Sequence, residues 1–124
     1  MTTMNVRFRV HFSDGTTLGP GKIDLLEGID RTGSLSQAAR DMSMSYRRAW
    51  VLLESMNTSY QEPVALTAKG GRGGGGASLT SFGRELIRLY RRFDAQLQVR
   101  GLRAFEPVRA QVRTVPARRA PKER

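Results

Sequence analysis

The 124-residue chain contains no cysteine, a single histidine and few acidic residues. Without cysteine it has no disulfide framework, no thiolate nucleophile and no sulfur-ligated metal site. The lone histidine, His11, cannot form a His-pair metal site within the chain, and no Ser/His/Asp arrangement stands out. We therefore expect no enzymatic activity, no cofactor and no bound metal.

Long apolar runs are also missing. No stretch of about 18 apolar residues is present, so we expect no membrane span and no membrane partner. The N-terminus lacks the apolar segment of a signal peptide, which predicts a cytoplasmic protein. The length fits one domain.

What the chain has in excess is positive charge. It carries 21 Lys and Arg residues against 11 Asp and Glu, a formal net charge of +10 at pH 7. Carboxylates for acid–base chemistry are scarce, whereas cations for a polyanion are plentiful. Such an excess favours nucleic acid or an anionic surface as partner. The alternative is a basic soluble protein with no such partner.

The N-terminal third predicts a strand or hairpin followed by a helix. Residues 5–12 alternate between apolar and polar, the period of a half-buried strand. The apolar members of this alternation are Val6, Phe8, Val10 and Phe12. Asp14-Gly15 indicates a turn and residues 16–18 a short return strand. Gly19-Pro20-Gly21 then predicts a break, and apolar residues recur at helical spacing from Lys22 to a stop at Gly33.

Two short helices with a tight break between them follow. Ser34-Leu-Ser-Gln37 has the form of a capping box and opens a helix that continues to Met42. Ser43-Met44 forms the break, and Ser45 caps a second helix from Tyr46 to about Met56. The expected core face of the second helix comprises Ala49, Leu53 and Met56. This arrangement is typical of a helix-turn-helix.

A two-stranded wing is expected next. Residues 64–68 and 77–80 resemble short strands, and a glycine-rich loop joins them. Its backbone and its cations predict contacts with phosphate or the minor groove, although the loop is otherwise a plain surface loop. The candidate DNA contacts in this loop are Lys69, Gly71, Arg72 and Gly74.

A long helix, capped by Thr80 or Ser81, closes the domain, and Gly101 is expected to end or loosen it. From Pro107 the composition shifts to six basic residues against one acidic, with three prolines. We therefore expect a domain over residues 1–106 and a disordered basic tail over 107–124. The tail either binds nucleic acid electrostatically or only aids solubility.

Together these elements predict an α+β, mostly α, winged helix-turn-helix fold. In such folds the second helix enters the major groove of DNA with its first turn leading. Subtracting the core face leaves Tyr46, Arg47, Trp50 and Val51 pointing outward, with Arg48 on the flank. Arginine pairs bidentately with guanine, which favours Arg47 for base reading.

The other candidate contacts of this helix pair keep two interpretations each. Arg48 either meets phosphate or is solvated, and the choice between Arg47 and Arg48 for base reading stays open. Tyr46 either contacts DNA or covers the helix end. Trp50 is a candidate contact, but packing between helices is favoured for it. The capping serines Ser34 and Ser45 complete the candidate DNA-binding residues.

Two blocks of sequence resemble the DNA-binding half of the molybdate-responsive ModE family. The first is Gly33-Ser-Leu-Ser-Gln-Ala-Ala39 with Ser45-Tyr-Arg-Arg-Ala-Trp50 and Met56-Asn57; alone it also resembles the LysR-type helix-turn-helix. The second runs from the glycine-rich loop through Leu79-Thr80 and Gly83 to Leu86-Ile-Arg-Leu-Tyr90. The family's molybdate-binding domains have no counterpart in these 124 residues, so the resemblance implies DNA binding without oxyanion sensing.

The resemblance also implies a homodimer. The family pairs through helices of this half, which here correspond to residues 22–32 and to the helix after the wing. The expected dimerisation residues in the latter are Phe82, Leu86, Leu89, Phe93 and Leu97. This apolar stripe is wider than the domain's own core needs, although it could instead cover that core.

These observations lead to one hypothesis and two alternatives. The hypothesis is a homodimeric, sequence-specific regulator of transcription that binds double-stranded DNA. The first alternative is a nucleoid-associated protein that binds DNA without sequence preference. The second is a protein-interaction module that forms a heterodimer with a related full-length regulator.

Overall fold

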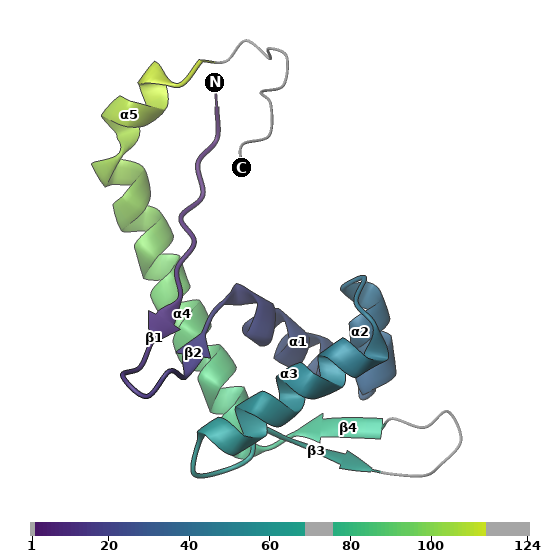
Figure 1. The fold of residues 1–124 in the computed structure, drawn as a ribbon. Helices are drawn as coiled ribbons and strands as arrows, with labels where there is room; N and C mark the ends of the chain where they lie inside the picture. The colour runs from purple at the N-terminus through teal and green to yellow at the C-terminus, as the bar shows by residue number, and fades with distance from the viewer. Residues whose placement is uncertain (1, 69–75, 114–124) are drawn as a thin grey trace.

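A computed structural model describes residues 2–68 and 76–113 (Figure 1). Small antiparallel hairpins and a majority of helix confirm the predicted α+β, mostly α, winged fold. The described elements are β1 (Val10–His11), β2 (Thr17–Leu18), α1 (Pro20–Thr32), α2 (Leu35–Asp41), α3 (Tyr46–Ser59), β3 (Ala65–Ala68), β4 (Gly76–Leu79), α4 (Ser81–Ala104) and α5 (Glu106–Gln111). Within the described ranges, no helix combines the length and apolar character needed to cross a bilayer.

Helix α1 begins two residues earlier than the sequence predicts. Gly19 is its N-cap and Pro20 its first residue, so the expected break at Gly19-Pro20-Gly21 is instead a helix start. Proline suits this position because a first-turn amide has no acceptor within the helix. The stop at Gly33 is confirmed, since its φ of 71° is left-handed and its N–H donates to the Ile29 carbonyl.

The predicted capping of the helix-turn-helix is confirmed in its main part. The Ser34 hydroxyl accepts from the Gln37 N–H at 3.0 Å, and the Ser45 hydroxyl accepts from the Arg48 N–H at 3.1 Å. The return bond of a capping box does not form, because the Gln37 amide donates to Asp41 Oδ1 at 2.8 Å instead.

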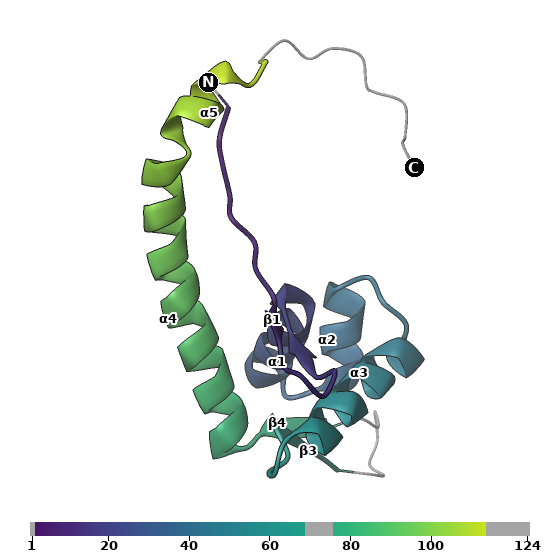
Figure 2. The same ribbon diagram turned by 60° about the vertical axis from the view of Figure 1, so that its left-hand side comes forward.

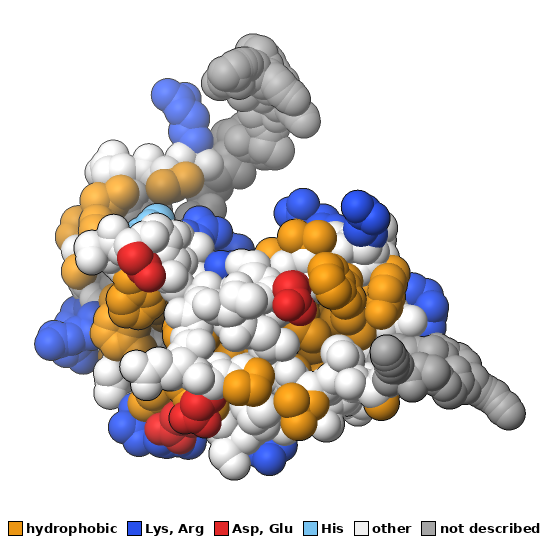
Figure 3. Space-filling view, turned by 60° about the horizontal axis from the view of Figure 1, so that its bottom comes forward, with side chains coloured by type: hydrophobic (Ala, Val, Ile, Leu, Met, Phe, Trp, Pro, Cys, Tyr) orange, Lys and Arg blue, Asp and Glu red, His pale blue; other side chains and the backbone are white. Residues whose placement is uncertain are grey.

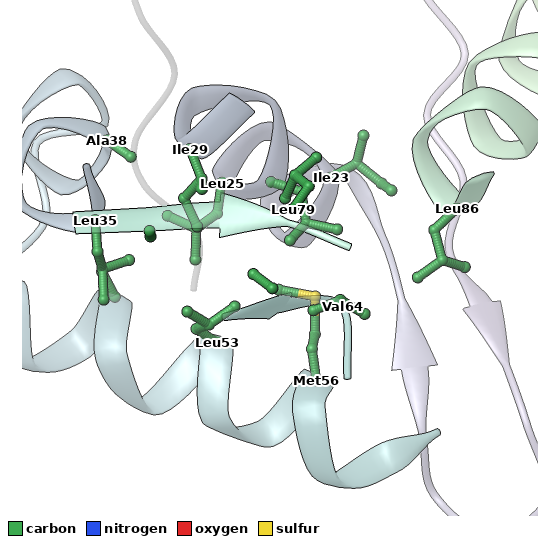
Figure 4. Close-up of a cluster of buried hydrophobic side chains, with 14 of the residues drawn as sticks. Ile23, Leu25, Ile29, Leu35, Ala38, Leu53, Met56, Val64, Leu79 and Leu86 are labelled. Carbon is green, nitrogen blue, oxygen red and sulfur yellow. The ribbon is translucent and has the colours of Figure 1, made fainter. Parts of the chain in front are cut away.

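The core lies where α1, α2, α3, the wing and the first turns of α4 meet (Figure 4). Helices α1 and α2 approach closely at Gly28, where a Cβ would lie 3.0 Å from Cβ of Ala38. Burial of this cluster is the main stabilising term for a domain of this size. Its largest fully buried members are Ile23, Leu25, Leu26, Ile29, Leu35, Met56 and Val64.

The N-terminal segment is not the eight-residue strand that the alternation predicts. Only Val10 and His11 pair with β2, and the residues before them run beside α4 (Figures 1 and 2). Gln98 holds the segment, since it accepts from the Val6 N–H at 3.0 Å and donates to the Val6 carbonyl at 2.6 Å. Val6, Phe8 and Val10 are half-buried as expected, but Phe12 is 49% exposed.

Helix α4 passes through Gly101, where the sequence predicts its end. Gly101 is buried, and a Cβ there would collide with the Val6 side chain, so the glycine serves close packing. The expected disorder from Pro107 is also wrong as far as Gln111, because α5 covers this stretch. Arg109 anchors α5 by donating to the Thr2 carbonyl at 2.6 Å. Residues 114–124 lie outside the described part of the chain.

Candidate nucleic-acid interface

Helix α3 has one buried face and one exposed face. Ala49, Leu53 and Met56 are 0 to 2% exposed and pack into the core, as predicted. The opposite side carries the residues that the core does not use: Tyr46 (48% exposed), Arg47, Trp50 (45%) and Val51 (53%). The expectation that Trp50 packs between helices is wrong, because its helical position points it to solvent.

The outward side chains of α3 form a shallow hollow of about 300 Å³. Its lining is Tyr46, Arg47, Trp50 and Val51. Figure 3 shows hydrophobic side chains gathered into a patch on this side of the molecule, with Lys and Arg side chains near its edges. A guanidinium beside apolar surface matches the edges of bases in the major groove, because arginine pairs with guanine and apolar groups contact the thymine methyl.

Arg48 is exposed but lies on a different side of α3 from Arg47. It lines a second hollow together with Arg9 and Lys22. The separation distinguishes the two arginines, since only Arg47 lies among the outward apolar residues. The hydroxyls of Ser34 and Ser45 are taken up by helix caps, so they position α2 and α3.

Asn57 attaches the wing to α3, a role that the sequence does not reveal. Its side-chain oxygen accepts from the Val64 N–H at 2.7 Å and the Ala65 N–H at 3.3 Å, and its amide donates to the Ala65 carbonyl at 3.1 Å. The wing is in antiparallel register from Ala65–Leu79 to Ala68–Gly76. The predicted contacts Lys69, Gly71, Arg72 and Gly74 lie outside the described residues.

The predicted dimerisation stripe does not lie on one free face. Leu86 is only 9% exposed and belongs to the core, and Phe82 packs edge-on against Tyr60 with centroids 5.4 Å apart. Leu89 and Phe93 are 47% and 49% exposed, and Phe93 also packs edge-on against Phe8, so their role in dimerisation stays a prediction. Leu97 is half-buried.

Helix α1 leaves no apolar side chain for a partner, contrary to the expectation for residues 22–32. Its leucines and isoleucines are all 0% exposed, because the domain's own core uses them. Exposed apolar residues gather instead on the far part of α4 and on α5, which project from the body of the domain (Figures 1 and 2). Val99 and Leu102 lie on α4 and Val108 lies on α5, while Phe105 stands between the two helices and Val112 directly follows α5.

Arg91 fixes the direction in which α4 leaves the body. Its guanidinium donates to both carboxylate oxygens of Glu27, at 2.7 and 2.8 Å, and to Asp24 at 2.9 Å. The hydrogen bond with Glu27 is the main reason that the pKa of Arg91 is raised. These contacts join α4 to α1.

Fold and surface together define a winged helix-turn-helix domain whose second helix presents an unburied face. Comparison with known proteins agrees with this class, because the similar proteins include regulators of transcription. The chain is 40% identical over 84 residues to the molybdenum transport protein ModE of Azotobacter vinelandii, covering 68% of this chain and 31% of that protein. It is 45% identical over 71 residues to the DNA-binding transcriptional dual regulator ModE of Escherichia coli K12, covering 57% and 27%.

A third relative is the molybdenum-pterin-binding protein MopB of Rhodobacter capsulatus, 43% identical over 81 residues, with 65% of this chain and 30% of that protein covered. No family model matches the sequence. The resemblance to ModE-type regulators is thus confirmed: the chain is related to these regulators and spans less than a third of the length of each of these three relatives.

Proposed function

We propose that this chain binds double-stranded DNA in a sequence-specific way and regulates transcription as a homodimer. The observation that carries the proposal is the outward face of α3, where a guanidinium stands among exposed apolar side chains that the core does not use. The relatives support it, since one of them is named a DNA-binding transcriptional dual regulator.

Reading of bases is assigned to Arg47 within this proposal. Arg47 stands in the first turn of α3, the part that enters the major groove in helix-turn-helix proteins. Trp50 and Val51, one turn further, supply apolar surface for thymine methyl groups. The wing lies beside α3 because Asn57 bonds to its first strand, so the loop that includes Lys69 and Arg72 supplies backbone contacts.

A second copy of this chain is the partner we propose for α4. Leu89 and Val99 are 47% and 60% exposed on a helix that projects beyond its own core. Pairing of two copies through these side chains removes apolar surface from water. A two-fold dimer then presents two α3 helices to half-sites about one helical turn apart. A related regulator that carries the same helix is the alternative partner.

The experiment is a selection from randomised duplex DNA at about 150 mM salt, where purely electrostatic binding is weakened. The proposal expects an enriched motif with two-fold symmetry. Retention of DNA without any motif favours the alternative of non-specific binding. The net charge of +10 is the observation that supports this alternative. No retention at all contradicts DNA binding and leaves the protein-interaction module.

A further inference from the structure

A second hollow, which contains basic side chains, lies beside the outward face of α3 that carries Arg47 and Trp50. It has a volume of about 340 Å³ and is formed where the N-terminal segment, the first turn of α1 and the first turn of α3 meet. Each of these elements contributes one cation: Arg9, Lys22 and Arg48. The rest of the lining is neutral, so the hollow carries positive charge only: Thr17, Gly19, Gly21, Met44 and Leu52.

The cations of this hollow have no acidic partner within the described ranges, where each ion pair involves other residues. Lys22 Nζ donates to the Thr17 carbonyl at 2.8 Å and to the Thr17 hydroxyl at 3.3 Å. An ammonium group has three N–H donors, so one is left for a ligand. These two bonds fix the position of the Lys22 side chain.

Arg9 is brought against the start of α1. Its side chain lies over Gly19, where a Cβ would come within 2.8 Å of its Nε. Partial burial, with the nearby Arg9 charge, lowers the pKa of Lys22. The fold therefore holds like charges together at a cost that an anion in the hollow would offset.

The backbone amides in the first turn of α1 add to the positive charge of this hollow. Gly19 caps α1 without a side-chain hydrogen bond, so no side chain occupies the amides of the first turn. Gly21 faces open space, with nothing within 4 Å of where its Cβ would be. An anion can thus approach the positive end of the helix dipole and the cations at once.

We infer that Arg9, Lys22 and Arg48 form a binding site for a phosphodiester group of the DNA backbone, adjacent to the bases that α3 contacts. The inference rests on the proposed function, since it takes the ligand to be the same duplex. A phosphate held here fixes the position of α3 along the groove. Contacts of this kind set position and affinity but carry no sequence information.

The test compares Arg9→Gln and Lys22→Gln with the control Arg100→Gln. Arg100 is an exposed residue of α4, which Figure 2 shows leading away from α3. Binding is measured on the selected duplex and on a scrambled duplex of equal length, over a range of salt concentrations. Thermal unfolding checks that each variant folds, and Arg9→Lys retains the charge.

Each site variant is expected to lose roughly tenfold in affinity on both duplexes, the effect of removing one hydrogen bond to a charged group. The slope of log K against log[salt] should become shallower by about 0.9. Arg9→Lys should recover most of the slope, and Arg100→Gln should behave as wild type. A loss confined to the selected duplex, or no loss beyond that of Arg100→Gln, overturns the inference.

Free phosphate is the other source of this ligand chemistry. Titration with inorganic phosphate at constant ionic strength, followed by the amide resonances of Gly21 and Lys22, distinguishes free phosphate from a DNA phosphodiester as the ligand. Saturable shifts without any effect of Arg9→Gln on DNA affinity assign a free anion and overturn the phosphodiester assignment. If wild type binds both duplexes equally, the proposed sequence specificity fails, yet the salt slopes of the variants still decide the site.

Discussion

Two single residues, the half-buried Asn57 and the buried Gly83, hold the start of the wing in place. Asn57 bonds to the backbone of Val64 and Ala65, and Gly83 lies against the carbonyl of Val64 from the other side. Asn57 reaches residues seven and eight positions further along the chain, and Gly83 contacts a residue 19 positions before it, so neither contact lies within one helical turn or one strand repeat. The sequence therefore gives no local signal for either, although both positions stand in the blocks that resemble ModE-type proteins.

Replacing Gly83 with alanine is expected to destabilise the fold. A Cβ at Gly83 would collide with the Val64 carbonyl, which is backbone and cannot swing away. We expect a loss of about 1–3 kcal/mol in the free energy of unfolding, measured by urea denaturation. The matched control is Gly21→Ala, also in the first turn of a helix but facing open space. It should gain up to about 1 kcal/mol, and equal effects would contradict the packing argument.

Asn57→Ala is expected to loosen the wing while leaving α3 folded. The change removes the acceptor of the Val64 and Ala65 amides and the donor to the Ala65 carbonyl. Leaving these groups unpaired should cost about 1–3 kcal/mol. Asn57→Asp keeps the acceptor and should cost less. Amide hydrogen exchange of β3 measures the effect; unchanged protection in Asn57→Ala would show that the wing is held by its apolar residues alone.

At the scale of residues, the sequence predicts what depends on near neighbours. Ser34 and Ser45 cap their helices as expected, because a cap is decided within four residues. The prediction for Trp50 is wrong because its size favours burial in general, whereas its helical position relative to Ala49 and Leu53 places it outside. The position of Trp50 on the helix therefore determines its exposure, because Ala49, Leu53 and Met56 already form the buried face of α3.

The element least predictable from the sequence is the arm made by α4, α5 and the N-terminal segment. The alternation over residues 5–12 does reflect a half-buried face, but that face packs on α4 and pairs with a strand only at Val10 and His11. Gly101 is the point where the N-terminal segment packs closely on α4, and the helix does not end there. Both errors have one cause, namely a contact between the two ends of the domain that local periodicity does not encode.

The double change Leu89→Glu and Val99→Glu is expected to convert the proposed dimer to monomers. Both side chains are exposed within one copy, so the substitutions should leave its fold intact while placing charges in the proposed interface. Sedimentation equilibrium measures the change. The control Gln61→Glu adds a charge at an exposed position after α3. A wild-type monomer, or a double variant that still dimerises, would contradict pairing through α4.

Across the whole molecule, charge and shape give separate parts of the account. The net charge of +10 indicates an anionic partner from composition alone. It does not indicate where the partner lies. The fold adds positions: it places Arg47 among apolar side chains and gathers Arg9, Lys22 and Arg48 in a neighbouring hollow, the two places that we propose for DNA contacts. Cations so far apart in the sequence could not be grouped before the fold was known.

Removing residues 114–124 is expected to reduce the salt dependence of DNA binding without changing sequence preference. The deleted stretch carries Arg118, Arg119, Lys122 and Arg124 against one acid, Glu123. It stops short of Arg109, whose bond to Thr2 helps to hold α5. Each phosphate that the shortened chain no longer neutralises should lower the slope of log K against log[salt] by about 0.9. An unchanged slope would show that this stretch does not contact DNA.

The most direct test of sequence reading is the affinity of wild type and Arg47→Ala for the selected duplex and for a scrambled one. Removal of a bidentate hydrogen-bonded pair with a base should cost about 1–3 kcal/mol, roughly 5- to 150-fold, on the selected duplex alone. On the scrambled duplex, binding should change by no more than about twofold. Equal losses on both duplexes would make Arg47 a backbone contact and contradict the assignment of base reading to the outward face of α3.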